Sequence, residues 1–100
     1  MTWTLRQTDK ALDDLADILD YIALDNPSAA EKLVTDLLAL FDQTRDYPLI
    51  GRAANEIAPG YRVLTHGRYL LIYRVRDEDK VIELIRVVHS ARDWPNLFDN

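Results

Sequence analysis

The sequence predicts an α+β fold, in which an antiparallel hairpin of two helices covers one face of an antiparallel sheet. Three observations support this. The N-terminus alternates apolar and polar residues, two amphipathic segments follow with a short junction, and the second half holds runs of β-branched, aromatic and aliphatic residues. The order of strand, two helices and then three to four strands is typical of α+β domains.

The first strand and the first helix are predicted from local spacing. Trp3 and Leu5 alternate with polar neighbours, which indicates a short strand. Thr8 is a suitable N-cap, and apolar residues then recur at spacings of three and four up to about Leu24. The opposite face of this helix is expected to be a solvent-exposed acidic strip of Asp13, Asp14, Asp17 and Asp20.

The second helix is predicted to begin at the junction itself. Asn26 is a good cap and Pro27 is tolerated at the first helical position, so the connection is very short and the helices form a hairpin. The helix ends before Tyr47, which precedes Pro48 and is therefore disfavoured in helical conformation.

Three strands are expected over residues 61–65, 69–75 and 81–88, and they form a meander. The turn at His66-Gly67 separates the first two, and a polar turn over residues 77–80 separates the last two. A further strand is expected between Arg52 and Ile57, although two alanines weaken its pattern. Tyr61, Tyr69 and Tyr73 are expected to be half-buried residues of this sheet.

Length and charge restrict the function. One hundred residues form a single domain, residues 1–100, and no apolar run approaches the ~20 residues that a membrane span needs. The absence of cysteine fits a reducing cytoplasm. Twelve basic against seventeen acidic residues argue against direct nucleic-acid binding, and the acidic residues are concentrated in the first half.

The residues also resemble a known family along nearly the whole chain. The similarity is carried by Ala11-x-x-Asp14-Leu15-x-x-Ile18-x-x-Tyr21-Ile22, Asn26-Pro27-x-Ala29-Ala30, Tyr47-Pro48-x-x-Gly51-Arg52, Gly60-Tyr61-Arg62, Tyr69 to Arg74 and Ile85-Arg86-Val87-Val88-His89-x-x-Arg92-Asp93. In their order and spacing these segments resemble the ParE branch of the RelE/ParE superfamily of toxins. The resemblance implies the same α+β fold, with the first strand beside the last.

The resemblance also implies a small cytoplasmic toxin that a cognate antitoxin binds and neutralises in a hetero-oligomer. The ParE branch is associated with inhibition of DNA gyrase, whereas the RelE branch cuts messenger RNA on the ribosome. We expect the ParE mode, binding without catalysis. A RelE-type endonuclease and a non-toxic member that only binds its antitoxin are the alternatives.

For RNA cleavage the sequence offers Glu56, Arg62, Arg86 and His89, with Arg68 and Arg74 as further cations. The tail, residues 94–100, has no Lys, Arg, His or Tyr, which favours a binding protein. His89 is expected mainly as a hydrogen-bonded structural residue at a strand end. No metal site and no cofactor are expected, because the two histidines are far apart and the acidic strip lacks convergent ligands.

A target-binding surface is expected around Arg92, Asp93 and Trp94, with His89 beside it. Arginine and tryptophan are frequent at the energetic centre of protein interfaces. An equally plain structural interpretation is that Asp93 caps a short terminal turn.

Overall fold

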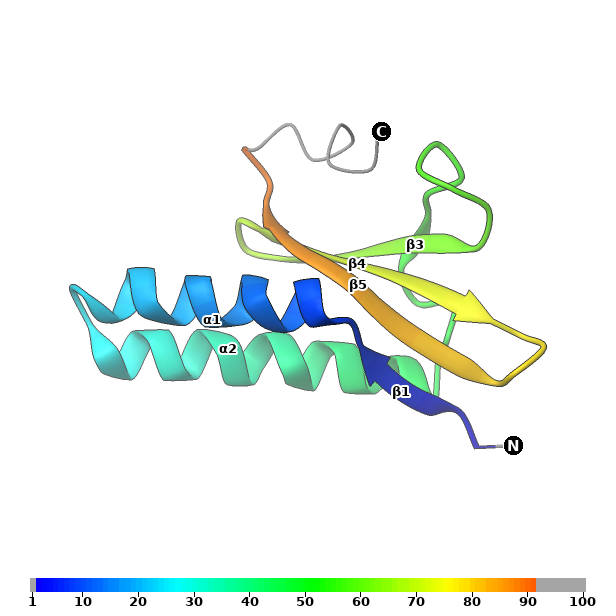
Figure 1. The fold of residues 1–100 in the computed structure, drawn as a ribbon, viewed down its shortest axis with the longest axis horizontal. Helices are drawn as coiled ribbons and strands as arrows, with labels where there is room; N and C mark the ends of the chain where they lie inside the picture. The colour runs from blue at the N-terminus through cyan, green and yellow to red at the C-terminus, as the bar shows by residue number, and fades with distance from the viewer. Residues whose placement is uncertain (1, 92–100) are drawn as a thin grey trace.

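The computed structural model describes residues 2–91. In chain order the elements are β1 (Thr4–Gln7), α1 (Asp9–Ala23), α2 (Pro27–Asp42), the 3-10 turn η1 (Gln43–Arg45), β2 (Arg52–Ala53), β3 (Tyr61–His66), β4 (Tyr69–Arg76) and β5 (Val81–His89). The two helices run side by side, and their hairpin extends past the sheet at the end that carries the α1–α2 connection (Figure 1). The predicted α+β fold is confirmed.

The sheet has five strands in the order β1-β5-β4-β3-β2. Strands β2 to β5 pair antiparallel as predicted, and β1 lies beside β5 as the family resemblance implied. The pairing of β1 with β5 is parallel, so the sheet is mixed. Alternation of apolar residues shows that a segment is a strand, but it carries no information on the direction of the neighbouring strand.

Both helix starts follow the sequence signals. The Thr8 hydroxyl accepts a hydrogen bond from the Ala11 N–H at 3.1 Å, and the Asn26 side chain accepts one from the Ala29 N–H at 3.1 Å. Pro27 is the first residue of α2, where its missing N–H costs nothing. The predicted caps are therefore confirmed.

Two clusters of apolar residues fill the two faces of the sheet. The larger one lies between the hairpin and the sheet and includes Leu15, Leu37, Phe41 and Leu71. The smaller one, of Ala54, Val63, Leu70, Ile72 and Val88, lies on the other face. Ala54 belongs to the segment between β2 and β3, so this segment covers part of the face that the helices leave open.

Some predicted details are corrected. The strand expected over residues 52–57 is only the two residues of β2, and Tyr73 is fully buried where a half-buried ring was expected. His66 is the last residue of β3 and pairs with Tyr69, so the turn consists of Gly67 and Arg68. Gly67 has φ 58°, a left-handed conformation that glycine adopts without a steric penalty.

Candidate protein-binding site

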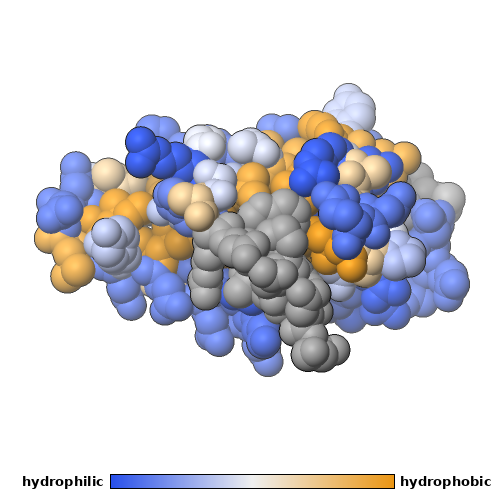
Figure 2. Space-filling view, turned by 90° about the horizontal axis from the view of Figure 1, so that it is seen from above, coloured by the Kyte–Doolittle hydropathy of each residue, from blue (hydrophilic) through white to orange (hydrophobic). Residues whose placement is uncertain are grey.

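A groove lies between α1 and the ends of β4 and β5. Its volume is about 250 Å³, and it is lined by Asp14, Asp17, Ile18, Tyr21, Tyr69, Val87, Val88 and His89. Figure 2 views the molecule from above, and hydrophobic residues are visible over the projecting end of the hairpin at the left. Tyr21, which lines the groove, is 75% exposed. The groove thus combines apolar and acidic groups on an accessible surface.

Asp14 joins α1 to β5 at the base of the groove. It accepts hydrogen bonds from Arg86 Nε at 2.7 Å, from Arg86 Nη2 at 3.0 Å and from the Val87 N–H at 2.9 Å. The hydrogen bonds with Asp14 raise the pKa of Arg86 above its usual value. Only 13% of the Asp14 side chain is exposed, so the expectation of a fully solvated acidic strip is wrong for Asp14. It holds for the other three aspartates.

His89 ends β5 at the rim of the groove. Its Nδ1 accepts a hydrogen bond from the Ala91 N–H at 3.1 Å, and its ring meets the Tyr69 ring edge to face, with 5.4 Å between centroids. Because Tyr69 is the first residue of β4, this contact ties the two strand ends together. The expected hydrogen-bonded histidine at a strand end matches this geometry.

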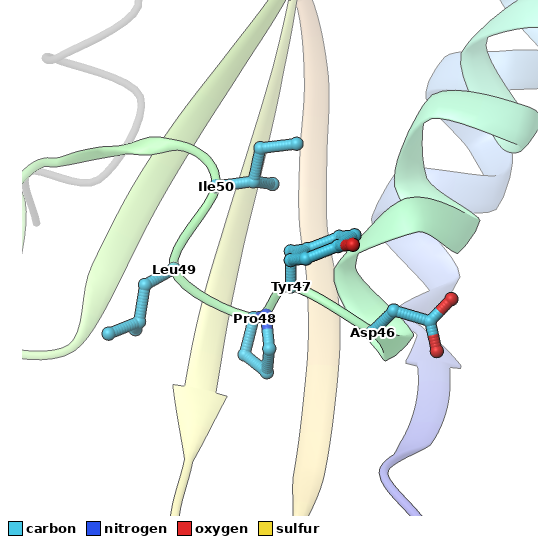
Figure 3. Close-up of a pocket in the computed structure, with 5 residues that line it drawn as sticks. All are labelled: Asp46, Tyr47, Pro48, Leu49 and Ile50. Carbon is cyan, nitrogen blue, oxygen red and sulfur yellow. The ribbon is translucent and has the colours of Figure 1, made fainter.

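A second candidate surface is the loop of Asp46, Tyr47, Pro48, Leu49 and Ile50, which lines an open depression of about 560 Å³. Figure 3 shows these side chains spread along the segment that leads from η1 toward β2. Tyr47 and Leu49 are 67% and 63% exposed. Exposed large apolar groups concentrated in one short loop are typical of a protein-binding surface.

Two residues of the sheet fix the backbone of this loop. The buried Tyr73 hydroxyl donates to the Pro48 carbonyl at 2.8 Å and accepts from the Gly51 N–H at 2.9 Å. Arg62 Nη1 donates to the Leu49 carbonyl at 3.2 Å and to the Gly51 carbonyl at 2.5 Å. The loop is therefore held in one shape although its side chains are exposed.

Gly51 is required where the loop passes over Tyr73. A Cβ atom at this position would lie 2.7 Å from the Val63 carbonyl oxygen and 2.8 Å from Tyr73 Cε1. Sequence reasoning found Gly51 only as part of a family segment and did not identify its partner Tyr73. The signal that was available was the segment Tyr47-Pro48-x-x-Gly51-Arg52, because proline and glycine close together are typical of turns.

The residues considered for RNA cleavage belong to four different networks. Glu56 pairs with Arg52 at 3.0 Å, Arg62 holds the loop carbonyls, Arg86 pairs with Asp14, and His89 contacts Tyr69. A backbone hydrogen bond and the Arg52 guanidinium lower the pKa of Glu56, which makes it a weaker base. Arg68 and Arg74 are exposed.

The remaining expectations meet the structure only in part. Arg92, Asp93 and Trp94, the predicted target-binding residues, lie outside the described residues. Within residues 2–91, no three His, Asp or Glu side chains are grouped as metal ligands would be. Neither described helix is long and apolar enough to cross a membrane.

Comparison with known proteins gives consistent results. The family model for the ParE toxin of the type II toxin–antitoxin system parDE matches residues 5–94. Toxin ParE1 of Mycobacterium tuberculosis is 42% identical over 64 residues, which is 64% of each chain and just under two thirds of that relative's length. Toxin RelE2 of Caulobacter vibrioides is 33% identical over 92% of this chain and 96% of its own.

A solved structure has the same fold. A chain of the chromosomal ParDE toxin–antitoxin system from P. aeruginosa superposes with a TM-score of 0.74 at 28% identity, over 88% of this chain and 96% of that one. The family match covers the first strand, the hairpin and the sheet. The chain therefore belongs to the ParE toxin family of type II toxin–antitoxin systems, within the RelE/ParE superfamily.

Proposed function

We propose that this chain is a toxin that inhibits DNA gyrase by binding, and that a cognate antitoxin holds it inactive in the cytoplasm. The observation that carries the binding mode is the dispersal of the candidate catalytic groups. Arg62 and Arg86 are each committed to structural hydrogen bonds, with the Gly51 carbonyl and with Asp14. Cleavage of RNA needs a base and phosphate-binding cations that converge on one reacting group.

The proposal of an antitoxin partner is supported by the groove beside α1. Its apolar residues Ile18, Tyr21 and Val87 offer contact area, and Asp17 gives it an acidic rim. A partner segment with apolar residues and basic neighbours fits this surface. The similar P. aeruginosa structure is of a toxin–antitoxin system, which agrees with a partner of this kind.

For the gyrase contact we retain the surface expected from the sequence, Arg92, Asp93 and Trp94 with His89 beside it. His89 is the last residue of β5 and lines the groove, and Arg92 follows it by three positions in the sequence. Truncation of an interface anchor such as Trp94 costs about 2 kcal/mol or more of binding.

The test compares two activities of the same preparations. Gyrase supercoiling and cleavage of ribosome-bound messenger RNA are measured for the parent and for the variants Arg92→Ala, Trp94→Ala and His89→Ala. We expect the parent to inhibit supercoiling, and we expect Arg92→Ala and Trp94→Ala to lose more of this inhibition than His89→Ala does. Thermal unfolding of each variant is the control, because a destabilised toxin would lose potency for another reason.

Three outcomes would contradict the proposal or part of it. RNA cleavage by the parent that His89→Ala abolishes would assign the RelE-type activity. No effect in either assay would leave a family member that only binds its antitoxin. Equal inhibition by all variants would disprove the proposed contact residues, but not the inhibition itself.

A further inference from the structure

The loop of residues 46–50 exposes several apolar side chains together. Tyr47, Leu49 and Ile50 are 67%, 63% and 45% exposed. In Figure 3 the Leu49 side chain points away from the hairpin, and Tyr47 lies on the hairpin side of the segment. Single exposed apolar residues are common on protein surfaces, but a contiguous group of them marks a binding site. The loop therefore offers a compact set of contacts to another molecule.

The backbone that carries these side chains is fixed. The buried hydroxyl of Tyr73 and the guanidinium of Arg62 both hydrogen-bond the backbone of the loop and of Gly51. Within the loop, the Ile50 N–H donates to the Tyr47 carbonyl at 3.0 Å. A loop whose backbone is ordered before binding loses little conformational entropy when a partner covers it. Contacts with its side chains can therefore contribute strongly to affinity.

A second copy of this chain is a poor occupant, because the patch is small. The exposed parts of the three side chains amount to about 300 Å², on a scale where a whole aromatic side chain buries 150–250 Å². A stable complex buries about 800 Å² on each partner. Two loops in contact would bury this small patch on both sides and little else. The patch fits better as the apolar centre of a larger interface, in which neighbouring residues form the rim.

The charges around the loop differ from those of the groove beside α1. The loop and the residues that contact or flank it carry three basic and three acidic side chains, Arg45, Arg52, Arg62, Asp42, Asp46 and Glu56. Arg45 pairs with Asp42 at 3.3 Å, and Arg52 pairs with Glu56 at 3.0 Å. The groove instead has an acidic rim, which favours a basic segment. The loop offers no such attraction, so its partner is a different one from the antitoxin segment.

The loop and the groove are also separate in position. Tyr69 lines the groove from the first position of β4, and Tyr73, which holds the loop, lies four residues further along that strand. Four residues of a strand span about 13 Å. Within the described part of the chain, no residue lines both the groove and the depression at the loop. An antitoxin segment in the groove thus makes its contacts without the loop residues.

We propose that the loop of residues 46–50 is an apolar anchor by which this toxin binds gyrase, in addition to the contact expected around Arg92 and Trp94. This inference rests on the proposed function, because it takes gyrase as the target. Tyr47 and Leu49 enter an apolar hollow of low charge on gyrase. The antitoxin in the groove then prevents binding at the other contact, beside His89, and recognises residues that gyrase does not use at the loop.

Truncation of single exposed side chains tests the anchor. The variants are Tyr47→Ala and Leu49→Ala, and Leu24→Ala is the matched control, because Leu24 is 83% exposed and lines neither surface. The Kd of each is measured for purified gyrase and for the purified protein encoded beside the gene of this chain. We expect the Kd for gyrase to rise about thirtyfold for Tyr47→Ala and about tenfold for Leu49→Ala, and to stay unchanged for the control.

Two further readings of the same variants belong to this test. The Kd for the neighbouring protein is expected to be the same for Tyr47→Ala, Leu49→Ala and the parent. A loss of that affinity equal to the loss for gyrase would mean that the loop serves the antitoxin, and would overturn the inference. Circular dichroism verifies that the variants fold, as is usual for substitutions at exposed positions.

Hydroxyl-radical footprinting of the parent identifies directly what covers the loop. Tyr47 and Leu49 are exposed in the free chain, so both side chains are expected to be oxidised. We expect this oxidation to be lost when gyrase is bound and to be unchanged when the neighbouring protein is bound. Protection by the neighbouring protein would assign the loop to the antitoxin. Protection in the free chain at high concentration would assign it to a second copy. Either result would overturn the inference.

The remaining outcomes separate this inference from the function on which it rests. If gyrase binds the parent, but Tyr47→Ala and Leu49→Ala bind it as tightly as Leu24→Ala, the loop is not an anchor and the proposed function stands. An equal loss of affinity in Leu24→Ala would show that the position of the apolar group does not matter, which also contradicts the anchor. If gyrase does not bind the parent at all, the proposed target and the anchor both fall.

Discussion

Asp14 binds Arg86 through both carboxylate oxygens, with Nε to Oδ2 at 2.7 Å and Nη2 to Oδ1 at 3.0 Å. The pair joins residues that are 72 positions apart, and side-chain exposure is 14% for Arg86 and 13% for Asp14. A bidentate pair shielded from water in this way is stronger than a surface ion pair. It attaches the long helix α1 to the last strand where β1 no longer reaches.

Replacement of Asp14 is therefore expected to destabilise the fold. In Asp14→Asn the Arg86 guanidinium loses its counter-charge while its side chain is only 14% exposed, which costs about 3 kcal/mol. Urea unfolding of Asp14→Asn and of the exposed neighbour Asp13→Asn measures the difference. The control is expected to change the free energy of unfolding by no more than about 0.5 kcal/mol. Equal stability of the two variants would show that the ion pair contributes nothing.

The Tyr73 hydroxyl is expected to stabilise the loop of residues 46–50. In Tyr73→Phe the Gly51 N–H and the Pro48 carbonyl lose their partner in a buried place, with an expected cost of about 1–3 kcal/mol. Tyr47→Phe, at an exposed position, is the matched control. Chemical denaturation distinguishes the two, and a Tyr73→Phe protein as stable as the control would contradict this role.

The same hydroxyl predicts a dependence of stability on alkaline pH. Burial raises the pKa of Tyr73 above its ordinary value of 10.0. Tyr73 therefore ionises at a lower pH in the unfolded chain than in the folded one. The stabilisation that its neutral hydroxyl gives is present below pH 10 and is lost as pH rises through the folded pKa. Between pH 8 and 11, the melting temperature is expected to fall more steeply for the parent than for Tyr73→Phe. Parallel curves would contradict the assignment.

Gly51→Ala is expected to disrupt the loop more than an alanine at a second glycine. The new methyl group would overlap the Val63 carbonyl and the Tyr73 ring, so the backbone must shift and the Arg62 and Tyr73 hydrogen bonds weaken. Gly67→Ala, whose Cβ would meet nothing within 4 Å, adds only the strain of a positive φ, about 1 kcal/mol. Thermal unfolding of both variants measures which substitution destabilises the fold more. A larger loss in Gly67→Ala would be the contrary result.

Local signals in the sequence were sufficient for much of the fold. Thr8 and Asn26 each cap a helix by a hydrogen bond with the residue three positions later. The apolar face of each helix likewise depends on spacings of three and four residues. Both features can therefore be read from neighbouring residues in the sequence. The parallel pairing of β1 with β5 joins residues 77 apart, and no local pattern encodes it.

The candidate site was harder to predict for the same reason. Asp14 has the same periodicity as the exposed aspartates, and only its position beside Arg86 and the Val87 N–H of β5 changes its role. Likewise, Tyr73 and Arg62 look like ordinary strand residues until the loop folds over them. In contrast, His89 was placed correctly at a strand end, because that position depends only on where the apolar run stops.

The acidic rim of the groove predicts a salt-dependent association with the antitoxin. Asp17→Lys reverses the charge beside the proposed basic segment, and we expect the association rate constant to fall about tenfold at low ionic strength. The exposed Asp77, in the turn between β4 and β5, lies at the opposite end of β5 from His89, and Asp77→Lys makes the same change in net charge there. Stopped-flow measurements of both variants and of the parent test whether a change of charge slows association only when it is made at the groove.

The salt dependence of the same rates completes this test. Above about 0.1 M salt the Debye length is roughly 10 Å or less, so the rate constants of the parent and of Asp17→Lys are expected to converge. The parent itself is expected to associate more slowly at physiological than at low ionic strength. If Asp17→Lys and Asp77→Lys slow association equally, net charge alone attracts the partner, and the groove is not where the basic segment first makes contact.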